Sequence, residues 1–216
     1  MIRVLEFSIY HSSNAYLGHF LAERALRDLP VEVVRQPLCV PKERGLWVAD
    51  LVGGKSNPRQ DSYNREDCLR WAKRHRIEMR FPDAPEVAKR VERWRAQPCA
   101  REELAARTYY GALGSGREAA LDAALFRAGY VDGADVNDEA VVRRASEAAG
   151  LDPDAAIGRA WEPEPGRLLG EALAAFDRLL CPGTPTFVVD GERFWGKDRV
   201  DWMADAVRRA VARQNV

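Results

Sequence analysis

Apolar and polar positions divide the chain into two end regions and a long middle. Residues 2–9 are rich in β-forming apolar side chains and predict a strand. A polar turn follows, and residues 15–26 then carry apolar side chains at helical spacing. Pro30 interrupts this pattern, and residues 31–34 predict a second strand. A strand, a helix and a strand in this order favour a parallel pair of strands.

The middle of the chain is predicted to be almost entirely helical. Residues 41–62 contain several glycines and prolines and predict a loop. Helical spacing then predicts helices at 64–75, 85–96, 101–114, 117–130, 138–149, 153–161 and 166–179. Asp138 and Asp152-Pro153 are typical of helix starts, and Gly150 is typical of a helix end.

The last region returns to strand patterns. Residues 186–189 predict a strand, Asp190-Gly191 is a tight hairpin signal, and residues 192–195 predict the returning strand. A final helix is expected after residue 199, because apolar residues recur on one face there. We therefore predict an α/β protein with one four-stranded layer. Its discontinuous α/β domain is expected at 1–40 and 181–216, and the helical insertion domain at 41–180.

Composition narrows the function classes. The chain has 216 residues, with 33 Lys+Arg against 33 Asp+Glu, so nothing favours nucleic acid or an anionic membrane as a partner. No signal peptide is evident, and no segment approaches the roughly 20 apolar residues of a membrane span, so a cytoplasmic protein is expected. The cysteines, which are Cys39, Cys68, Cys99 and Cys181, form no CxxC pair. Neither a local redox pair nor a metal site is expected.

Three positions carry candidate chemistry. Ser12 lies where the first strand turns into the first helix, so it is either a helix cap or a hydroxyl beside an anion held at the helix N-terminus. Ser13 is its rival for either role. Thr184-Pro185 precedes a strand, where a trans proline is the ordinary alternative to a cis one. Asp198, between Lys197 and Arg199, either caps the last helix or meets a charged ligand.

Several motifs in this order resemble one family. They are Ser12-x-x-Ala15-Tyr16-Leu17, Gly183-Thr184-Pro185-Thr186-Phe187, Phe194-Trp195-Gly196-Lys197-Asp198-Arg199 and, within the insertion, Leu125-Phe126-Arg127-Ala128-Gly129-Tyr130. The chain resembles the DsbA-type thioredoxin superfamily, and within it the 2-hydroxychromene-2-carboxylate isomerases and kappa-class glutathione transferases. The resemblance implies a thioredoxin-like fold with a large helical insertion. It departs from the family pattern at Ser13 and Asn14, and it is weak at 83–116.

The resemblance also implies roles for single residues. Ser12 stands where redox members carry their attacking cysteine, so it is expected to hold the sulfur of glutathione as a thiolate. Pro185 is expected to be cis, with Thr184 presenting its backbone to the tripeptide. Lys197, Asp198 and Arg199 are expected at the γ-glutamyl end, and Asn57 at the other end.

The implied activity is a glutathione-dependent isomerase. Its substrate is expected to be a small electrophilic aromatic or conjugated carboxylate, with reversible thiolate addition as the reaction. Alternatives are a kappa-like transferase, a thiol-disulfide oxidoreductase, which lacks a thiol at position 12, and a non-catalytic small-molecule-binding descendant. A homodimer is implied as well. His11 as a base and Cys181 near the site are lesser candidates, and Trp47, Trp71 and Trp94 are expected to be packing residues or pocket walls.

Overall fold

The computed structural model describes residues 1–55 and 57–214. Ser56 of the predicted loop and residues 215–216 of the predicted α/β domain lie outside the described residues. The sheet layer is built from β1 (Ile2–Ser8), α1 (Ser13–Leu26), β2 (Val31–Pro37), β3 (Thr186–Val189), β4 (Glu192–Trp195), the 3-10 turn η1 (Lys197–Arg199) and α10 (Val200–Gln214). Between β2 and β3 lie α2 (Val48–Leu51), α3 (Pro58–His75), α4 (Ala84–Ala96), α5 (Glu103–Gly111), α6 (Glu118–Tyr130), α7 (Glu139–Ala148), α8 (Pro153–Ala160) and α9 (Pro163–Arg178).

The sheet has four strands in the order β2-β1-β3-β4. β1 and β2 are parallel, and their register runs from Ile2 opposite Val31 to Ser8 opposite Pro37. β3 is antiparallel to both β1 and β4. The predicted parallel pair and the predicted hairpin are therefore confirmed. Asp190 and Gly191 both have positive φ at the hairpin, as a tight turn between twisted strands requires.

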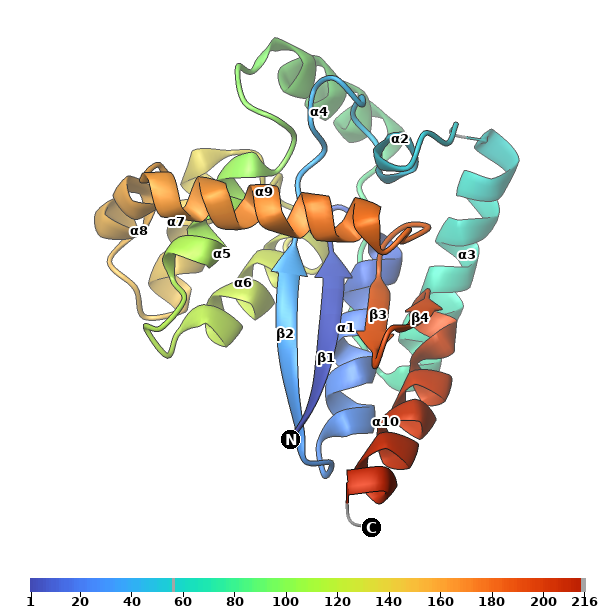
Figure 1. The fold of residues 1–216 in the computed structure, drawn as a ribbon. Coiled ribbons are helices and arrows are strands. Elements are labelled where there is room, and N and C mark those ends of the chain that lie inside the picture. Colours follow the sequence, from blue (N-terminus) through green and yellow to red (C-terminus); the bar gives the residue numbers. More distant parts are fainter. Residues whose placement is uncertain (56, 215–216) are drawn as a thin grey trace.

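The two faces of the sheet belong to different cores, because neighbouring strand residues point to opposite faces. Ile2 and Val4 join a cluster with residues of α1 and α10. Phe7 and Val188 join a second cluster with Leu169, Ala172 and Phe176 of α9 and with tyrosines of α5. Figure 1 shows α9 crossing the sheet near the end where β1 and β2 finish, while α1 and α10 lie along the strands. This end of the sheet is also where α1 begins, so the helical insertion surrounds the helix N-terminus.

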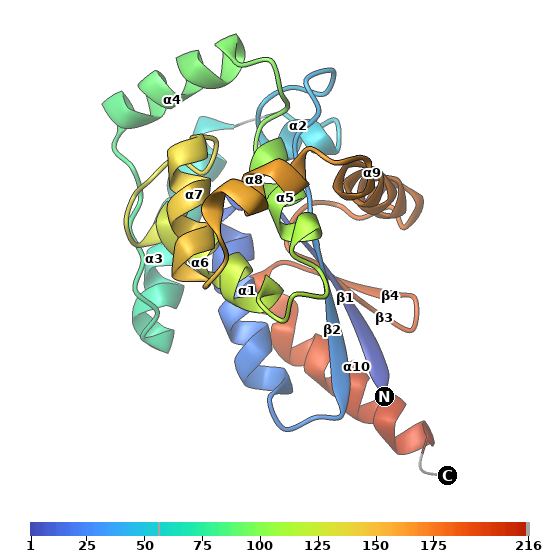
Figure 2. The same ribbon diagram turned by 90° about the vertical axis from the view of Figure 1, so that its left-hand side faces the viewer.

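The predicted loop at 41–62 was wrong in part. The short helix α2 forms within it, and α3 begins at Pro58 rather than at residue 64. The signals were local: Asn57 caps the helix by accepting a hydrogen bond from the N–H of Arg59, and proline is favoured in the first helical turn. Figures 1 and 2 show α4 at the outer end of the insertion, beyond the strand ends. No helix in the described part of the chain has the length and apolar character needed to cross a bilayer.

A charged network is buried beside β1. The fully buried ring of His19 lies 3.3 Å from Glu6 and 3.6 Å from Asp122. Arg35 on β2 lies 3.4 Å from Asp122 and 3.7 Å from Glu6. Burial by itself lowers the pKa of His19, but the two carboxylates outweigh it and raise this pKa above 6.5. The same network lowers the pKa of Glu6 against the effect of burial.

The stability that His19 contributes is expected to fall as pH rises. Because folding raises the pKa of His19, its contribution is complete below the unfolded-state pKa of about 6.5 and is lost as pH rises through the folded-state pKa. The difference in free energy of unfolding between the wild type and His19→Gln should therefore shrink from about pH 6 to about pH 9. Urea titrations over this range measure it, and a difference independent of pH would contradict the assignment.

Candidate active site

Ser12 is the N-cap of α1. Its hydroxyl oxygen accepts a hydrogen bond from the N–H of Ala15 at 3.2 Å, which is the usual capping contact. The hydroxyl donates its proton to the carbonyl oxygen of Thr184 at 3.1 Å, across 172 residues of sequence. Ser12 therefore joins the first strand-to-helix turn to the loop that precedes β3. The hydroxyl of Ser12 caps α1 and contacts Thr184 at the same time. Its role as a helix cap therefore does not exclude a role beside an anion at the helix N-terminus.

Two helix N–H groups remain open at this end of α1. The N–H of Tyr16 donates to the carbonyl of Ser12, and Ala15 is capped, whereas the N–H groups of Ser13 and Asn14 meet no acceptor within the described structure. Open N–H groups at a helix start, together with the positive end of the helix dipole, favour an anion. The side chain of Ser13 turns toward α3, where it accepts hydrogen bonds from Asn64 at 3.2 Å and from the thiol of Cys68 at 3.5 Å.

The Thr184-Pro185 peptide bond is cis. Pro185 is buried against α1, where a Cβ added to Gly18 would lie 2.7 Å from the proline ring. Only a glycine lets α1 approach the loop this closely. Thr184 is 4% exposed, and its hydroxyl oxygen has no hydrogen-bond partner among the described residues. Thr184 thus offers an unused polar group directly beside Ser12.

The three charged residues of η1 have different surroundings. Asp198 and Arg199 line the same cavity as Ser12, and they pair with each other at 2.6 Å. Lys197 does not line it. Its ammonium is buried against Asp67 at 2.7 Å and the side-chain oxygen of Asn14 at 2.9 Å. Asp198 and Arg199 can therefore meet a ligand, whereas Lys197 ties η1 to α3 and α1.

One cavity of about 940 Å³ brings most of the predicted residues together. Ser12, Asn57, Thr184, Asp198 and Arg199 line it, and Pro185 and Lys197 do not. Asn57 is exposed at its rim, and its side-chain carbonyl already caps α3. The aromatic part of the lining comes from Trp47, Phe81, Trp94, Tyr130 and Trp195. Trp71 lies outside the cavity and stacks on His75.

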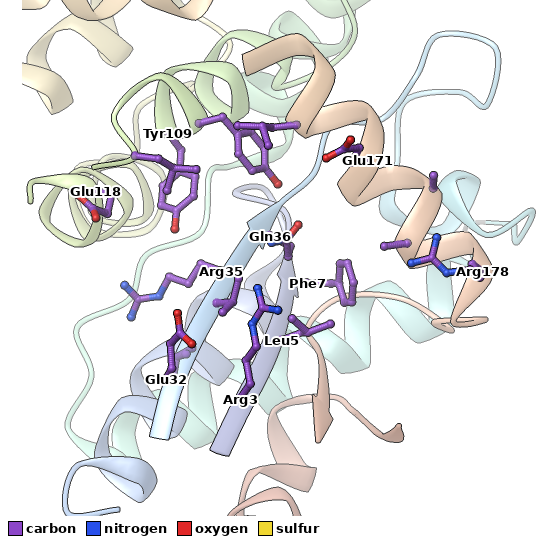
Figure 3. Close-up of a pocket in the computed structure, with 17 residues that line it drawn as sticks. Arg3, Leu5, Phe7, Glu32, Arg35, Gln36, Tyr109, Glu118, Glu171 and Arg178 are labelled. Carbon is purple, nitrogen blue, oxygen red and sulfur yellow. The ribbon is translucent and has the colours of Figure 1, made fainter. Parts of the chain in front are cut away.

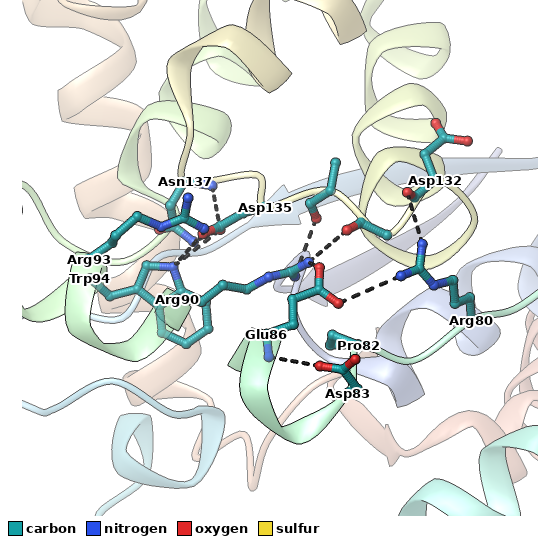
Figure 4. Close-up of polar contacts among 12 residues, drawn as sticks. Arg80, Pro82, Asp83, Glu86, Arg90, Arg93, Trp94, Asp132, Asp135 and Asn137 are labelled. Carbon is teal, nitrogen blue, oxygen red and sulfur yellow. Dashed lines mark hydrogen bonds and ion pairs between the residues drawn. The ribbon is translucent and has the colours of Figure 1, made fainter. Parts of the chain in front are cut away.

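Helix α4, which begins in the charged segment after Phe81-Pro82, contributes Val87, Arg90 and Trp94 to the lining of this cavity. Asp83 caps α4 by accepting a hydrogen bond from the N–H of Glu86. Arg90 donates to the carbonyl of Gly133 at 2.7 Å, and Arg93 pairs with Asp135 at 2.9 Å. Figure 4 shows these side chains of α4 directed toward the segment that follows α6. These contacts hold α4 against the segment that follows α6. They lie in the stretch 83–116, where the resemblance to the family is weak.

The cavity also contains Arg101 and Glu102, which sequence reasoning missed, beside His11, which it named as a lesser candidate. His11 Nδ1 lies 2.8 Å from a carboxylate oxygen of Glu102, and burial followed by the charge of Arg101 lowers the pKa of His11 below 6.5. The ring is therefore neutral at pH 7, and its Nε2 has no partner in the described part of the chain. His11 and Glu102 are 91 residues apart, so no spacing signal announces the pair. The Ser12 proton goes to Thr184, so this is not the arrangement of a serine nucleophile with its base.

The cysteines are poorly placed for disulfide exchange. None of them lines the cavity. Cys68 comes nearest, through its contact with Ser13, but it is fully buried, and burial raises its thiol pKa. Burial likewise raises the pKa of Cys181 to about 11. A thiol that stays protonated and covered is a poor attacking group.

Another hollow, of about 740 Å³, lies on the sheet face beneath α9. Figure 3 shows Leu5 and Phe7 at its floor, with Arg3, Glu32 and Glu171 around it. None of the residues predicted from the sequence lines it. This hollow is lined by residues of both charges. The cavity at Ser12 brings the predicted residues together and is therefore the candidate active site.

Comparison with known proteins agrees with this geometry. The family model of the DSBA-like thioredoxin domain matches residues 3–208. A structure of 2-hydroxychromene-2-carboxylate isomerase superposes with a TM-score of 0.76 at 19% identity, covering 99% of this chain and 98% of that chain. A probable DsbA oxidoreductase from Streptomyces coelicolor gives 0.75 at 20% identity, covering 98% and 91%. The cytosolic disulfide reductase DsbM from Pseudomonas aeruginosa, solved with GSH, gives 0.60 at 16% identity, covering 100% of both chains.

These structural likenesses extend over whole chains, but their identities are low, so they show a shared fold. A search of curated proteins found no match. The predicted α/β class with a helical insertion is confirmed by the sheet order, by the helices between β2 and β3, and by the family match. The chain belongs to the DSBA-like thioredoxin domain family.

Proposed function

We propose that this protein binds glutathione at the N-terminus of α1 and acts as a glutathione-dependent isomerase of an aromatic or conjugated carboxylate. The observation that carries the proposal is the set of hydrogen-bond donors at one end of the cavity. The hydroxyl of Ser12 and the open N–H groups of Ser13 and Asn14 gather there, where no cysteine is present. Such a site suits a thiolate brought by a ligand rather than one formed on the chain.

The other polar groups of the cavity fit a tripeptide. Thr184 has an unpartnered hydroxyl and lies just before β3, where an extended peptide can align with backbone groups. Asp198 can receive an ammonium, and Arg199 beside it can receive a carboxylate. The side-chain carbonyl of Asn57 serves the α3 cap, and its amide N–H₂ meets no acceptor within the described part of the chain.

Bound glutathione supplies a thiolate that adds reversibly to an electrophilic carbon. The chain's part is electrostatic. Ser12 turns its hydroxyl from Thr184 to the sulfur, and the N–H groups of Ser13 and Asn14 donate from the helix end. Together they lower the cost of holding negative charge on the sulfur. The aromatic walls, among them Trp94 and Tyr130, cover the acceptor and exclude water.

Three other activities remain distinguishable by experiment. A kappa-like transferase uses the same residues and releases the adduct, so product analysis separates it from an isomerase. A disulfide oxidoreductase is disfavoured by the buried thiols, and insulin reduction that is lost on cysteine replacement would restore it. A descendant that only binds small molecules would take up conjugated aromatic acids without turnover. The homodimer and the cytoplasmic location stay predictions.

Removing the Ser12 hydroxyl should raise the thiol pKa of bound glutathione. A hydrogen bond to a charged group contributes about 1.5–3 kcal/mol, so Ser12→Ala is expected to raise that pKa by about one to two pH units. The thiolate absorbance of the complex, followed against pH, measures it. Calorimetric titration with S-methylglutathione serves as control, since a ligand without a thiol should bind the wild type and Ser12→Ala about equally.

Ser13→Ala is the matched variant, because Ser13 has the same side chain one residue further on and faces α3. It should leave the thiol pKa of bound glutathione unchanged. The reverse result would be a higher thiol pKa of bound glutathione in Ser13→Ala and an unchanged one in Ser12→Ala. It would show that Ser13, and not Ser12, contacts the sulfur. Absence of glutathione binding by the wild type would end the proposal.

A further inference from the structure

Arg101 is a buried cation that forms no ion pair with any described residue. The residue is 4% exposed and lies between α4 and α5, where it lines the cavity. Its guanidinium lies over Trp94, 3.4 Å from the ring centroid, and 5.0 Å from the ring centroid of Trp47. Among the described residues, no carboxylate reaches ion-pair distance of it. This is unusual, because buried charges are normally paired.

The nearby carboxylates are engaged elsewhere. Glu102 holds His11 at 2.8 Å, and its other oxygen has no partner in the described structure. Asp135 accepts hydrogen bonds from Arg93 at 2.9 Å, from the indole N–H of Trp94 and from Asn137. Burial lowers the pKa of Arg101 to about 10, so the guanidinium still carries its charge at neutral pH. A charged group thus lines the cavity with no carboxylate of the described residues at ion-pair distance, although Glu102 and Asp135 act on it from further away.

The free hydrogen-bond donors of Arg101 are on one edge. Nη1 donates to the carbonyl of Leu46 at 2.7 Å. Nε is buried without a partner, and Nη2 donates to no described group. Nε–H and Nη2–H form the fork that matches the two oxygens of a carboxylate. Trp94 lies against the guanidinium at 3.4 Å, Trp47 lies further off at 5.0 Å, and Arg101 lines the cavity.

The backbone around Arg101 is fixed. Its carbonyl accepts a hydrogen bond from the N–H of Val40 at 3.0 Å, and the next N–H, of Glu102, donates to Asn137 at 2.7 Å. Glu102 has φ of 66°, a left-handed conformation that costs a non-glycine residue free energy. Contacts from three segments therefore hold the guanidinium in one place before any ligand arrives, which reduces the entropy lost on binding.

The cavity wall near Arg101 combines aromatic rings with the charged side chains of Arg90, Glu102 and Asp135. Trp47 and Trp94 meet edge to face at 5.7 Å, and Tyr130 and Phe81 contribute two more rings. The facing ring of His11 is neutral and has an unpartnered nitrogen. A flat apolar body carrying one carboxylate complements such walls and such a fork.

We propose that Arg101, which lies against Trp94 with Trp47 nearby, is the specificity-determining residue that binds the carboxylate of an aromatic acid in this cavity. The inference rests on the proposed function for the reaction that follows binding. Its own claim is narrower: carboxylate recognition by Arg101, separate from the thiolate end at Ser12. Aromatic acids should therefore bind the free protein without glutathione.

The test compares 2-naphthoate with 2-naphthamide on the full chain in the absence of glutathione. Both are flat and nearly equal in size, and only the first carries a charge. Calorimetry, supported by tryptophan fluorescence, should show that the wild type prefers the naphthoate by about 10- to 100-fold, as expected for a bidentate charge-assisted contact. Arg101→Gln should lose this preference while it still binds the amide. Equal binding of both probes by the wild type would overturn the inference, as would a preference that survives in Arg101→Gln.

The matched control is Arg65→Gln. Arg65 also lines the cavity, but its side chain is exposed at the rim and donates to the carbonyl of Pro82 at 3.1 Å. This variant should keep the preference for naphthoate, and its loss there would place the carboxylate at the rim.

Two further measurements keep the result unambiguous. If Arg101→Gln fails to fold, the assigned Nε–H resonance of Arg101 in the wild type should shift with naphthoate and not with naphthamide. The absence of that shift would contradict the inference. Glutathione titration of the wild type is done separately. Failure of glutathione to bind would end the proposed function, whereas the outcome with naphthoate alone decides the role of Arg101.

Discussion

Phe126→Ala is expected to lower the free energy of unfolding by about 3–5 kcal/mol, the range for removing a buried aromatic ring. Phe126 on α6 is fully buried, and its ring centroid lies 5.0 Å from that of Tyr10 and 5.2 Å from that of His19. It therefore joins the helical insertion to the end of β1 and to α1. Truncation leaves a void at this junction and removes both ring contacts.

Urea denaturation followed by far-ultraviolet circular dichroism measures the loss. A fall in the melting temperature of roughly 6–20 °C should accompany it in a chain of this size. Tyr63→Ala provides the comparison, since Tyr63 is 63% exposed and its truncation should cost less than about 1 kcal/mol. If the two variants were equally stable, Phe126 would not be a principal contact between the insertion and the sheet layer.

Asp67→Asn is the second large effect we expect. The change keeps the shape and the acceptor oxygen but removes the only carboxylate that pairs with buried Lys197 in the described structure. Breaking a buried ion pair by removing one partner costs about 3–5 kcal/mol. The Asp67 side chain is 26% exposed, so a loss of about 2–3 kcal/mol is expected here.

Thermal and urea unfolding measure this loss, and a double variant tests its cause. Asp67→Ala combined with Lys197→Met removes both charges and should be more stable than Asp67→Asn. Glu66→Gln is the neighbouring control: Glu66 pairs with Arg70 on the exposed surface of α3, so the change should cost less than about 1 kcal/mol. An Asp67→Asn protein as stable as Glu66→Gln would show that Lys197 does not depend on Asp67.

The sequence does not show which of the charged residues at 197–199 faces the cavity. The run Lys197-Asp198-Arg199 predicts charged groups at a helix start, and these three residues do form the turn before α10. Which of them faces the ligand cavity is decided by α3. The ammonium of Lys197 donates hydrogen bonds to Asp67 on that helix and to Asn14 on α1. Of the three residues, Asp198 and Arg199 therefore line the cavity.

The start of α3 has a local sequence signal, whereas the cavity residues from distant segments do not. The combination of Asn57 and Pro58 is a local helix-start signal, but the glycines just before it favour a loop. Among the cavity residues, Arg101 and Glu102 have no local signal at all, and His11 is marked only by its position beside Ser12. They come together only when α5 docks against the end of β1, since His11 and Glu102 are separated by 91 positions.

The sequence by itself determined the order of strands and helices at both chain ends, the tight hairpin at Asp190-Gly191, and a serine instead of a thiol at the start of α1. These features depend on local periodicity and turn chemistry, which short segments carry unaided. Only the tertiary structure decided that the Ser12 hydroxyl meets Thr184, that Lys197 is buried outside the cavity, and that Arg101 lines the cavity with no ion pair among the described residues. Those outcomes depend on desolvation and on partners distant in sequence, and no local pattern records which groups lose water together when the helices pack.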